Sequence, residues 1–365
     1  MIVSDGNVYF WSMDFPSSNS LDVTRLATVF NSTSATYKFY WFISLTEACE
    51  QGITDISKRE MFARMLSNAW YTVNYFHVSF SSQDIIQQAI KKISETENIP
   101  VNIKKEHLLI WLMDSKNSTT VNILKHFDKN VPHWFLTPWI KRNGGENDTV
   151  YKKRIYAESQ AYKDQALYAL HQEQIVINPI WIEYLKANAR ILKDYCLWNL
   201  SNFLQVRNPS IPDIPGKLIK PPLRGSLTKQ RKEYWDIVLN ELNGVDCIYT
   251  NTKLFQDNYA LDHFVPHAFV SHDLIWNLAP INTAFNSIKS DKLPNIDQHF
   301  DKFYYLQKAA YEIINHHNPK NRYLEEYLTI FPILSDSFEF DYQRYKETIQ
   351  PLITIAGNNG FTSII

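Results

Sequence analysis

A proline-rich segment divides this chain and constrains its fold more than any other feature. It reads RNPSIPDIPGKLIKPPLRGSLTKQRK over positions 207–232. Proline lacks a backbone donor and has a fixed φ, so such a segment favours an extended, semi-rigid connection over a helix or a central strand. Because 365 residues suffice for about two or three domains, we expect a separate folded part on each side.

The first part has the apolar periodicity of helices. Its 37–49 segment is apolar on nearly every side, which is typical of a buried helix. Ser82 is the expected N-cap of a helix over 82–96, and Asn178 with Pro179 marks another helix start. The prolines and the Gly-Gly pair within 130–150 predict a loop or short hairpin. Further helices are expected over 58–76, 104–114 and 118–127.

The second part combines helices with a small mixed segment. Helices are expected over 228–242, 297–317 and 322–331. Between them the pattern predicts one strand over 245–254, a second over 259–266, and a helix that opens near Pro280 and ends before Pro294. The expected fold class is mainly α, with a helical N-terminal domain and a small α+β module.

These patterns give the expected domain boundaries. Residues 1–215 form a helical domain whose role the sequence does not reveal, and residues 216–227 form a basic, proline-rich linker. Residues 228–300 form the mixed module, and residues 301–365 form C-terminal helices that pack on it.

Composition limits the compartment and the partners. The net charge is -1, so binding to a polyanion must come from local patches. Three widely separated cysteines indicate no disulfide framework. The N-terminus does not resemble a signal peptide, and the longest apolar run, 39–45, is too short for a bilayer. We expect a soluble cytoplasmic protein without a membrane partner.

Four polar residues of the mixed segment suit phosphodiester hydrolysis. A histidine such as His263 can take a proton from water near neutral pH. The carboxylate of Asp262 and the amide oxygen of Asn286 are hard ligands suited to Mg²⁺. A hairpin followed by a helix that packs across it can bring these three residues together, and Asn277 lies between them in the sequence.

The same residues resemble the HNH, or ββα-metal, nucleases, and most closely the HNH segment of the CRISPR-associated RNA-guided nucleases. Asp262-His263 is followed by Asn277 fourteen residues after the histidine, by Asn286 nine residues later, and by KSD at 289–291. The flanking DHFVPHAF and KSDKLP also fit. The front half is similar to that of bacterial HNH-containing proteins with a helical N-terminal domain.

The resemblance implies a role for each matching position. Asp262 and Asn286 would hold Mg²⁺ or Mn²⁺, and His263 would be the general base. Asn277 would order the loop and orient His263 through a side-chain to backbone hydrogen bond. Lys289 would lie near a phosphate. The activity implied is endonuclease cleavage of DNA, with bacterial defence or restriction as its setting.

Two departures from the family narrow these expectations. Many HNH proteins hold a structural zinc with paired cysteines. Here Thr250 stands where a partner of Cys247 is needed, and Asn282 and Phe285 occupy the second pair's positions, so no structural zinc is expected. The RNA-guided nucleases also carry a second nuclease domain and an arginine-rich guide-binding helix, which we do not find.

The basic run from 216 to 232 is the expected nucleic-acid contact outside the site. It lacks acids and leads into the mixed module, so we expect it to follow phosphates, although a solvated face is the alternative. The expected contacts are Arg224, Lys229, Arg231 and Lys232. One module would nick one strand, so cutting both strands would need a homodimer or two successive events. The resemblance also allows a protein partner in a defence complex.

Other interpretations of the quartet stay open. Asp262 and His263 could satisfy turn backbone while Asn286 lies on a helix surface, which would leave an inert binding or adaptor protein. A ribonuclease or structure-selective nuclease would use the same residues. His267 and His272 are near enough to be alternative ligands; we expect His267 to be structural or to face DNA, and His272 with Asp273 to cap a helix.

Overall fold

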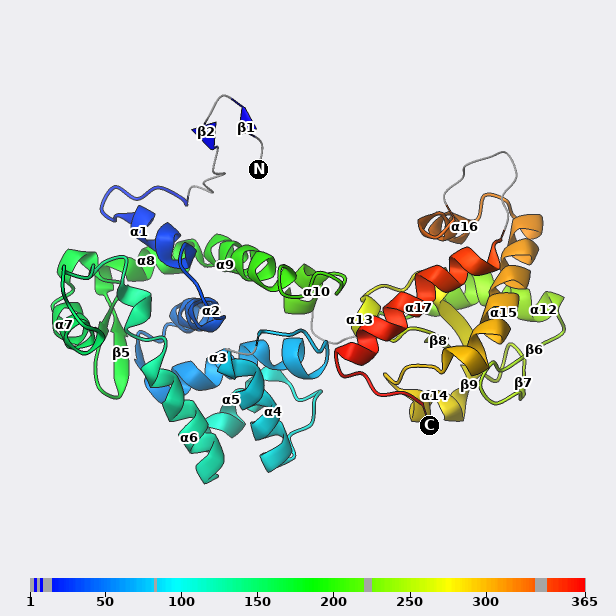
Figure 1. Cartoon of the computed structure of the whole chain (residues 1–365), viewed down its shortest axis with the longest axis horizontal. Coiled ribbons are helices and arrows are strands. Elements are labelled where there is room, and N and C mark those ends of the chain that lie inside the picture. Colours follow the sequence, from blue (N-terminus) through cyan, green and yellow to red (C-terminus); the bar gives the residue numbers. More distant parts are fainter. Residues whose placement is uncertain are drawn as a thin grey trace. The chain divides into compact units, whose positions relative to one another are not determined.

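The computed structural model of the chain describes residues 15–81, 84–219, 225–331 and 340–364, together with the backbone of two short strands, β1 (Val3–Ser4) and β2 (Asn7–Val8). The described residues divide into two compact units. The first unit takes its residues from 1–75 and 79–208, and the second from 76–78 and 209–365. Figure 1 shows the elements of each unit.

The first unit is built mainly from helices. Short 3₁₀ turns cover Thr28–Phe30, Phe127–Lys129, Trp134–Leu136 and Lys163–Gln165. The helices are α1 (Val23–Ala27), α2 (Tyr37–Glu50), α3 (Lys58–Asn74), α4 (Ile85–Glu97), α5 (Lys105–Asp114), α6 (Ser118–His126), α7 (Asp148–Gln160), α8 (Pro179–Ala187) and α9 (Ala189–Gln205).

Helix α2 is the centre of this unit, as its all-round apolar sequence predicts. Its residues from Phe39 to Leu45 are all buried, and it packs against α3, α8 and α9. Trp41 is fully buried, and its ring lies 6.0 Å from that of Phe62 on α3. The prediction of a buried helix over 37–49 is therefore confirmed.

Two caps show how local chemistry sets the helix starts. Asn178 caps α8 by accepting a hydrogen bond from the Ile180 amide at 3.3 Å, with Pro179 in the first turn, as predicted. The predicted N-cap of α4, Ser82, lies outside the described residues. The N-cap is Asp84, whose carboxylate accepts from the Ile86 amide at 3.0 Å.

The first unit also contains a small sheet that the sequence pattern did not predict. Its antiparallel strands are β3 (Asp55–Ser57), β4 (Tyr168–Leu170) and β5 (Gln174–Ile177), in the order β3-β5-β4. Each strand is too short to show an alternation of polar and apolar residues. The sheet joins a segment near position 56 to one near position 175, so no local signal announces it.

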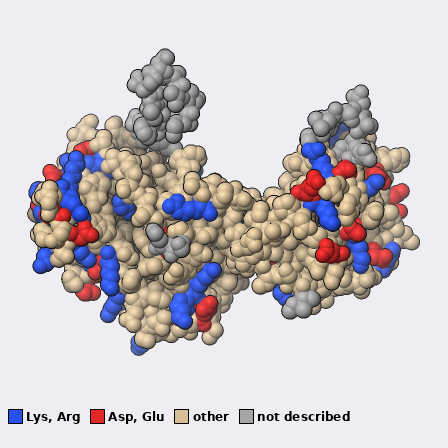
Figure 2. All heavy atoms as spheres, viewed as in Figure 1, with Lys and Arg blue, Asp and Glu red and all other residues tan. Residues whose placement is uncertain are grey.

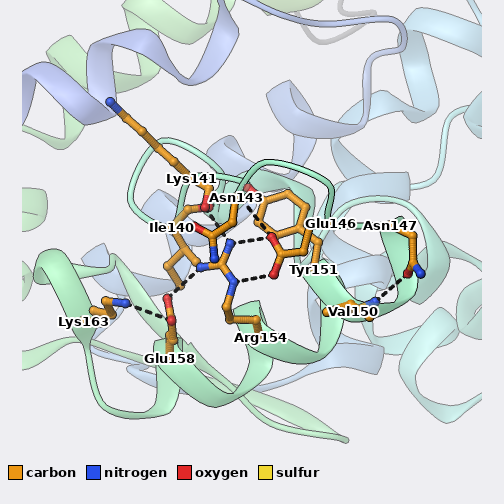
Figure 3. Close-up of polar contacts among 10 residues, drawn as sticks. All are labelled: Ile140, Lys141, Asn143, Glu146, Asn147, Val150, Tyr151, Arg154, Glu158 and Lys163. Carbon is orange, nitrogen blue, oxygen red and sulfur yellow. Dashed lines mark hydrogen bonds and ion pairs between the residues drawn. The ribbon is translucent and has the colours of Figure 1, made fainter.

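The 130–150 region is a loop rather than a hairpin, and α7 holds it in place (Figure 3). The Arg154 guanidinium bonds both carboxylate oxygens of Glu146 at 2.7 Å and the carbonyl of Lys141 at 2.6 Å. This bidentate pair holds the pKa of Glu146 at about 2. Asn147 then caps α7 by accepting from the Val150 amide at 3.0 Å.

The second unit carries the mixed module and the C-terminal helices. Two 3₁₀ turns of this unit cover Ile275–Asn277 and Tyr327–Thr329. Its helices are α10 (Ile214–Ile219), α11 (Thr228–Gln230), α12 (Asp236–Glu241), α13 (His267–Val270), α14 (Thr283–Lys289), α15 (Ile296–His317), α16 (Arg322–Glu326) and α17 (Tyr342–Asn358). Its strands are β6 (Val245–Asp246), β7 (Lys253–Leu254), β8 (Tyr259–His263) and β9 (Leu278–Asn282).

The hairpin of the mixed module differs from the predicted one. The partner of β8 is β9, with Asp262 opposite Ala279 and His263 opposite Leu278, while β6 and β7 form a separate pair. Pro280 was expected to open the helix but lies in β9, opposite Leu261. The helix α14 begins after Asn282, whose side chain accepts from the Phe285 amide at 3.0 Å.

Parts of the linker and the whole of the following helix lie within the described residues. Residues 214–219 form α10, where the buried Lys217 ammonium bonds the Phe269 carbonyl at 2.8 Å and the Ser271 hydroxyl at 2.6 Å. Lys217 is thus committed within the fold rather than available to a phosphate. The predicted 228–242 helix is present as α11 and α12, joined by a π-helical turn over Arg231–Trp235.

The C-terminal helices cover the hairpin of the second unit. Helix α15 packs against β9, α12, α16 and α17. Phe303 of α15 stacks on Phe264, directly after β8, with ring centroids 4.0 Å apart. No described helix is long and apolar enough to cross a membrane.

Candidate active site

Asp262 and His263 form the end of β8 and lie inside the module rather than on a surface turn. Asp262 is 3% exposed and His263 is 2% exposed. The Asp262 carboxylate meets α14, while the His263 ring meets the loop that precedes β9. Burial on this scale is rare for an unpaired acid, so each side chain needs specific partners.

Asn277 fixes the chain immediately after His263. Its amide oxygen accepts from the Val265 amide at 2.8 Å, and its Nδ2 donates to the Val265 carbonyl at 2.8 Å. The Asn277 carbonyl also accepts from the Phe264 amide at 2.7 Å. Asn277 is completely buried. These side-chain to backbone bonds set the direction in which the chain leaves β8.

Helix α14 brings Lys289 and Asn286 to the hairpin. The Lys289 ammonium donates to Asp262 Oδ2 at 2.8 Å and to the His263 carbonyl at 2.7 Å, and its side chain is fully buried. Asn286 precedes Lys289 by three residues and therefore lies on the same helix face. It is half-buried, and its side chain makes no hydrogen bond among the described residues.

The His263 ring is held by Asp273, an acid that was expected, with His272, to cap a helix. His263 Nε2 lies 2.9 Å from Asp273 Oδ1, within hydrogen-bond distance. The hydrogen bond from His263 holds the pKa of Asp273 below its usual value. His263 Nδ1 is buried and has no hydrogen-bond partner among the described residues.

Two further histidines surround this pair. His267 Nε2 is 3.8 Å from Asp273 Oδ1, beyond hydrogen-bond distance, and its ring stands edge-on to that of His263 at 5.1 Å. His272 Nδ1 lies 3.4 Å from the Leu274 amide. Burial lowers the pKa of His272 to about 4, so its ring is neutral at pH 7.

Tyr249 is a neighbour of Asp262 that no sequence signal indicated. Its ring stacks on Phe285 of α14 at 5.1 Å and stands edge-on to His299 of α15 at 4.9 Å. Burial raises the pKa of Tyr249, and the nearby Asp262 carboxylate raises it further. Tyr249 is thus a buried ring, packed between α14 and α15, that senses the charge of Asp262.

The C-terminal helices hold the loop that carries Asp273. Glu326 of α16 accepts from the Ile275 amide at 2.5 Å, and burial raises the pKa of this carboxyl group. Gln307 of α15 donates to the Leu278 carbonyl at 2.6 Å and accepts from the Tyr327 hydroxyl. The loop and the start of β9 are therefore fixed by residues far away in sequence, which a local motif cannot reveal.

The predicted nucleic-acid contacts fall into different environments. Arg224 lies outside the described residues. Lys229 and Lys232 are exposed. Arg231 instead donates to the Tyr259 and Gln256 carbonyls at 3.2 and 2.6 Å, and its guanidinium lies 4.2 Å from the Tyr259 ring centroid. On the second unit, the face in Figure 2 shows cationic side chains among acidic ones rather than one continuous basic surface.

The sequence that builds this site matches a family of known proteins. Residues 247–295 match the family of HNH endonucleases. The matched segment, called the HNH segment below, contains β7, β8, β9 and α14 with Asp262, His263, Asn277 and Asn286. No curated protein and no solved structure matches the chain significantly. The family match supports a nuclease of the hydrolase class with a nucleic acid as substrate.

HNH nucleases generally depend on a divalent metal, so the donor set of the HNH segment can be tested against such an ion. The described residues contain no group of three His, Cys, Asp or Glu side chains that could hold a metal. Asp262 and Asn286 supply one carboxylate and one amide, both oxygen donors, which fits Mg²⁺ because this ion keeps several water ligands. The Lys289 ammonium already neutralises one oxygen of Asp262.

Cys247, at the start of the HNH segment, is a buried residue of the polypeptide turn between β6 and β7. Its backbone amide donates to the Thr252 carbonyl at 2.8 Å, and its sulfur lies 3.4 Å from the Asn282 amide. The thiol thus ties the β6–β7 pair to the end of β9 by packing and a weak hydrogen bond.

Proposed function

We propose that this protein is a metal-dependent endonuclease that hydrolyses phosphodiester bonds in DNA. The observation that carries the proposal is the state of His263 within the HNH segment. Its ring is buried and held at Nε2, and its Nδ1 has no hydrogen-bond partner among the described residues. A fixed imidazole with a vacant basic nitrogen is what proton removal from water requires.

In the proposed reaction, His263 Nδ1 takes a proton from a water molecule. The water oxygen forms a bond to phosphorus as the bond from phosphorus to the 3′ oxygen breaks, and the leaving oxygen takes a proton from solvent. The products are a 5′-phosphate and a 3′-hydroxyl. Asn277 supports this step by fixing the backbone on the C-terminal side of His263.

Asp262 and Asn286 are the residues that would hold Mg²⁺ or Mn²⁺. When bound, such an ion supplies charge neutralisation on the phosphate and on the leaving oxygen. Because Lys289 is paired with Asp262, we assign Lys289 to charge balance within the site and no longer to direct contact with a phosphate. Lys229 and Lys232, which are exposed, are the proposed contacts to the nucleic-acid backbone.

The experiment that tests the function is a plasmid cleavage assay with the purified full chain, with and without Mg²⁺ or Mn²⁺. We expect metal-dependent nicked or linear DNA from the wild-type protein. His263→Ala and Asn286→Ala should abolish the product while retaining DNA binding. His317→Ala is the matched control, because His317 is an exposed histidine at the end of α15.

The outcomes separate the competing functions. Cleavage of RNA but not of DNA would favour a ribonuclease, which the same residues could serve. Binding without cleavage of either substrate, unchanged by His263→Ala, would favour an inert binding or adaptor protein. Nicks without linear product would indicate that one HNH segment acts on one strand and that a double-strand cut needs a second copy. Bacterial defence or restriction is the setting proposed for this activity.

A further inference from the structure

The acid that contacts His263 is attached to a loop rather than to the hairpin. Asp273 lies between α13 and β9, and its side chain is 30% exposed, whereas that of His263 is 2% exposed. The distance from His263 Nε2 to Asp273 Oδ1 is 2.9 Å. The buried ring thus has a single carboxylate at one nitrogen, and that carboxylate reaches the protein surface.

This contact determines which ring nitrogen carries the proton. A carboxylate can only accept hydrogen bonds, so a bond to Asp273 requires hydrogen on His263 Nε2. A neutral imidazole has one N–H, and Nδ1 must then carry the lone pair. Nδ1 is the buried nitrogen without a hydrogen-bond partner among the described residues. The geometry therefore makes Nδ1 the basic nitrogen.

The Asp273 loop is held from several elements of the second unit. Ser271, at a left-handed φ of 60°, accepts a hydrogen bond from Lys217 of α10 at 2.6 Å. Glu326 of α16 accepts from the Ile275 amide, and Gln230 of α11 donates to the Asp273 carbonyl at 3.4 Å. Anchors on both sides of Asp273 leave its carboxylate little freedom to turn away from His263.

The neighbouring charged and titratable groups do not offer His263 an equivalent partner. Asp262 is engaged with Lys289, and Lys289 donates to the His263 backbone carbonyl rather than to the ring. His267 stands edge-on to the ring. Glu326 accepts from the backbone amide of Ile275.

We propose that Asp273 is a positioning residue that holds His263 in the Nε2–H tautomer, so that Nδ1 carries the lone pair that accepts the proton of the attacking water. The inference rests on the proposed nuclease function and deepens it. Carboxylate partners of this kind orient imidazoles and raise their basicity, and their loss commonly reduces activity 10–100-fold. Asp273 touches neither the water nor the phosphate, and it acts through His263 alone.

The first measurement is the tautomer of His263 in the wild-type full chain. Long-range ¹H–¹⁵N correlation spectra of ¹⁵N-histidine-labelled protein distinguish Nε2–H from Nδ1–H, and the His263→Ala spectrum identifies the His263 signals. We expect Nε2–H in the wild-type protein and loss of this pure tautomer in Asp273→Asn. An Nδ1–H tautomer in the wild-type protein would overturn the inference, whatever its activity.

The second measurement compares the kinetics of Asp273→Asn with those of the wild-type protein. We expect kcat to fall about 100-fold, with KM for DNA and the affinity for Mn²⁺ measured by EPR unchanged. Asp257→Asn is the matched control, because Asp257 is exposed in a turn of the same segment. An unchanged kcat in Asp273→Asn, or an equal loss in Asp257→Asn, would refute the positioning role.

Failure of the proposed function gives a different pattern. If the wild-type protein cleaves neither DNA nor RNA, the proposed nuclease function is refuted. The measured tautomer would still show whether Asp273 holds the His263 ring. Because the tautomer is measured on the wild-type protein and His263→Ala serves only to assign the signals, a failure of Asp273→Asn to fold does not prevent the test.

Discussion

At the residue scale, Lys289 shows how the site balances its buried charge. A buried carboxylate without a cation is costly, and Lys289 lies 2.8 Å from Asp262 with its own side chain fully buried. Any metal that binds Asp262 must share this carboxylate with the ammonium. Lys289 is therefore both a structural partner of Asp262 and a competitor for its oxygens.

Replacing Lys289 by methionine tests this double role. Lys289→Met removes the cation from a buried pair, so we expect the free energy of unfolding to fall by about 3 kcal/mol. On the proposed metal assignment, Mg²⁺ should then stabilise the variant more than it stabilises the wild-type protein, because binding to the folded state raises its stability. Urea unfolding with and without Mg²⁺ measures both effects.

The control for this experiment is Lys320→Met, since Lys320 is exposed beyond the end of α15. It should leave stability and the Mg²⁺ increment unchanged. Equal Mg²⁺ increments in Lys289→Met and in the wild-type protein would argue against competition at Asp262.

At the element scale, the helical run from Thr228 to Glu241 separates cations that the sequence presents as one group. Arg231 lies in the π-helical turn and bonds two backbone carbonyls near β8, while Lys229 and Lys232 are exposed to solvent. A wide helical turn of this kind shifts the register of side chains. Periodicity alone could not assign the three cations to different faces.

Substitutions of these cations should therefore affect two different properties, DNA binding and folding stability. Lys229→Ala with Lys232→Ala should weaken DNA binding and reduce the slope of log K against log salt by about two, one for each phosphate that is no longer neutralised. Arg231→Ala should instead lower stability, because it removes two hydrogen bonds and the guanidinium over Tyr259. Fluorescence anisotropy over a salt series, together with urea unfolding, separates the two. A smaller salt slope with intact stability in Arg231→Ala would contradict this division.

Which elements could be predicted from sequence depends on how local their signals are. Helices such as α2 and α15 repeat apolar residues over several turns, so the pattern finds them. The predicted hairpin partner of β8 was wrong because Pro280 was expected to start a helix, although an isolated proline is tolerated in a short two-stranded hairpin. The HNH spacing placed Asp262, His263 and Asn277 in the module, but the bond from His263 to Asp273 depends on a loop that Glu326 and Lys217 hold.

At the scale of the whole molecule, each of the two units contains a histidine whose pKa is lowered by burial, so that its ring is neutral at pH 7. His133 lies in the first unit and is 1% exposed, and burial lowers its pKa to about 4. His272 in the second unit is half-buried, and burial lowers its pKa to about 4 as well. Since an unfolded histidine titrates near pH 6.5, the unfolded chain binds more protons than the folded chain between these values.

The consequence is a loss of stability in acid that begins well above the range where carboxylates titrate. Stability rises with pH wherever the unfolded state binds more protons, so the contribution of His133 is complete above pH 6.5 and is lost as the pH falls towards 4. We expect His133 alone to account for about 1–2 kcal/mol of the loss between pH 7 and pH 5. Because most of the tryptophans lie in the first unit, urea unfolding followed by tryptophan fluorescence reports this effect.

His133→Phe keeps a ring beside Trp134, whose centroid is 4.6 Å away, and removes the titrating group. The first unit of this variant should lose less stability between pH 7 and pH 5 than that of the wild-type protein. His107→Phe, at an exposed position of α5, should show the wild-type dependence. If His133→Phe and the wild-type protein lose stability equally, other groups must carry the acid sensitivity of the first unit. If only the second unit loses stability between pH 7 and pH 5, the acid sensitivity belongs instead to the loop of His272, beside the proposed active site.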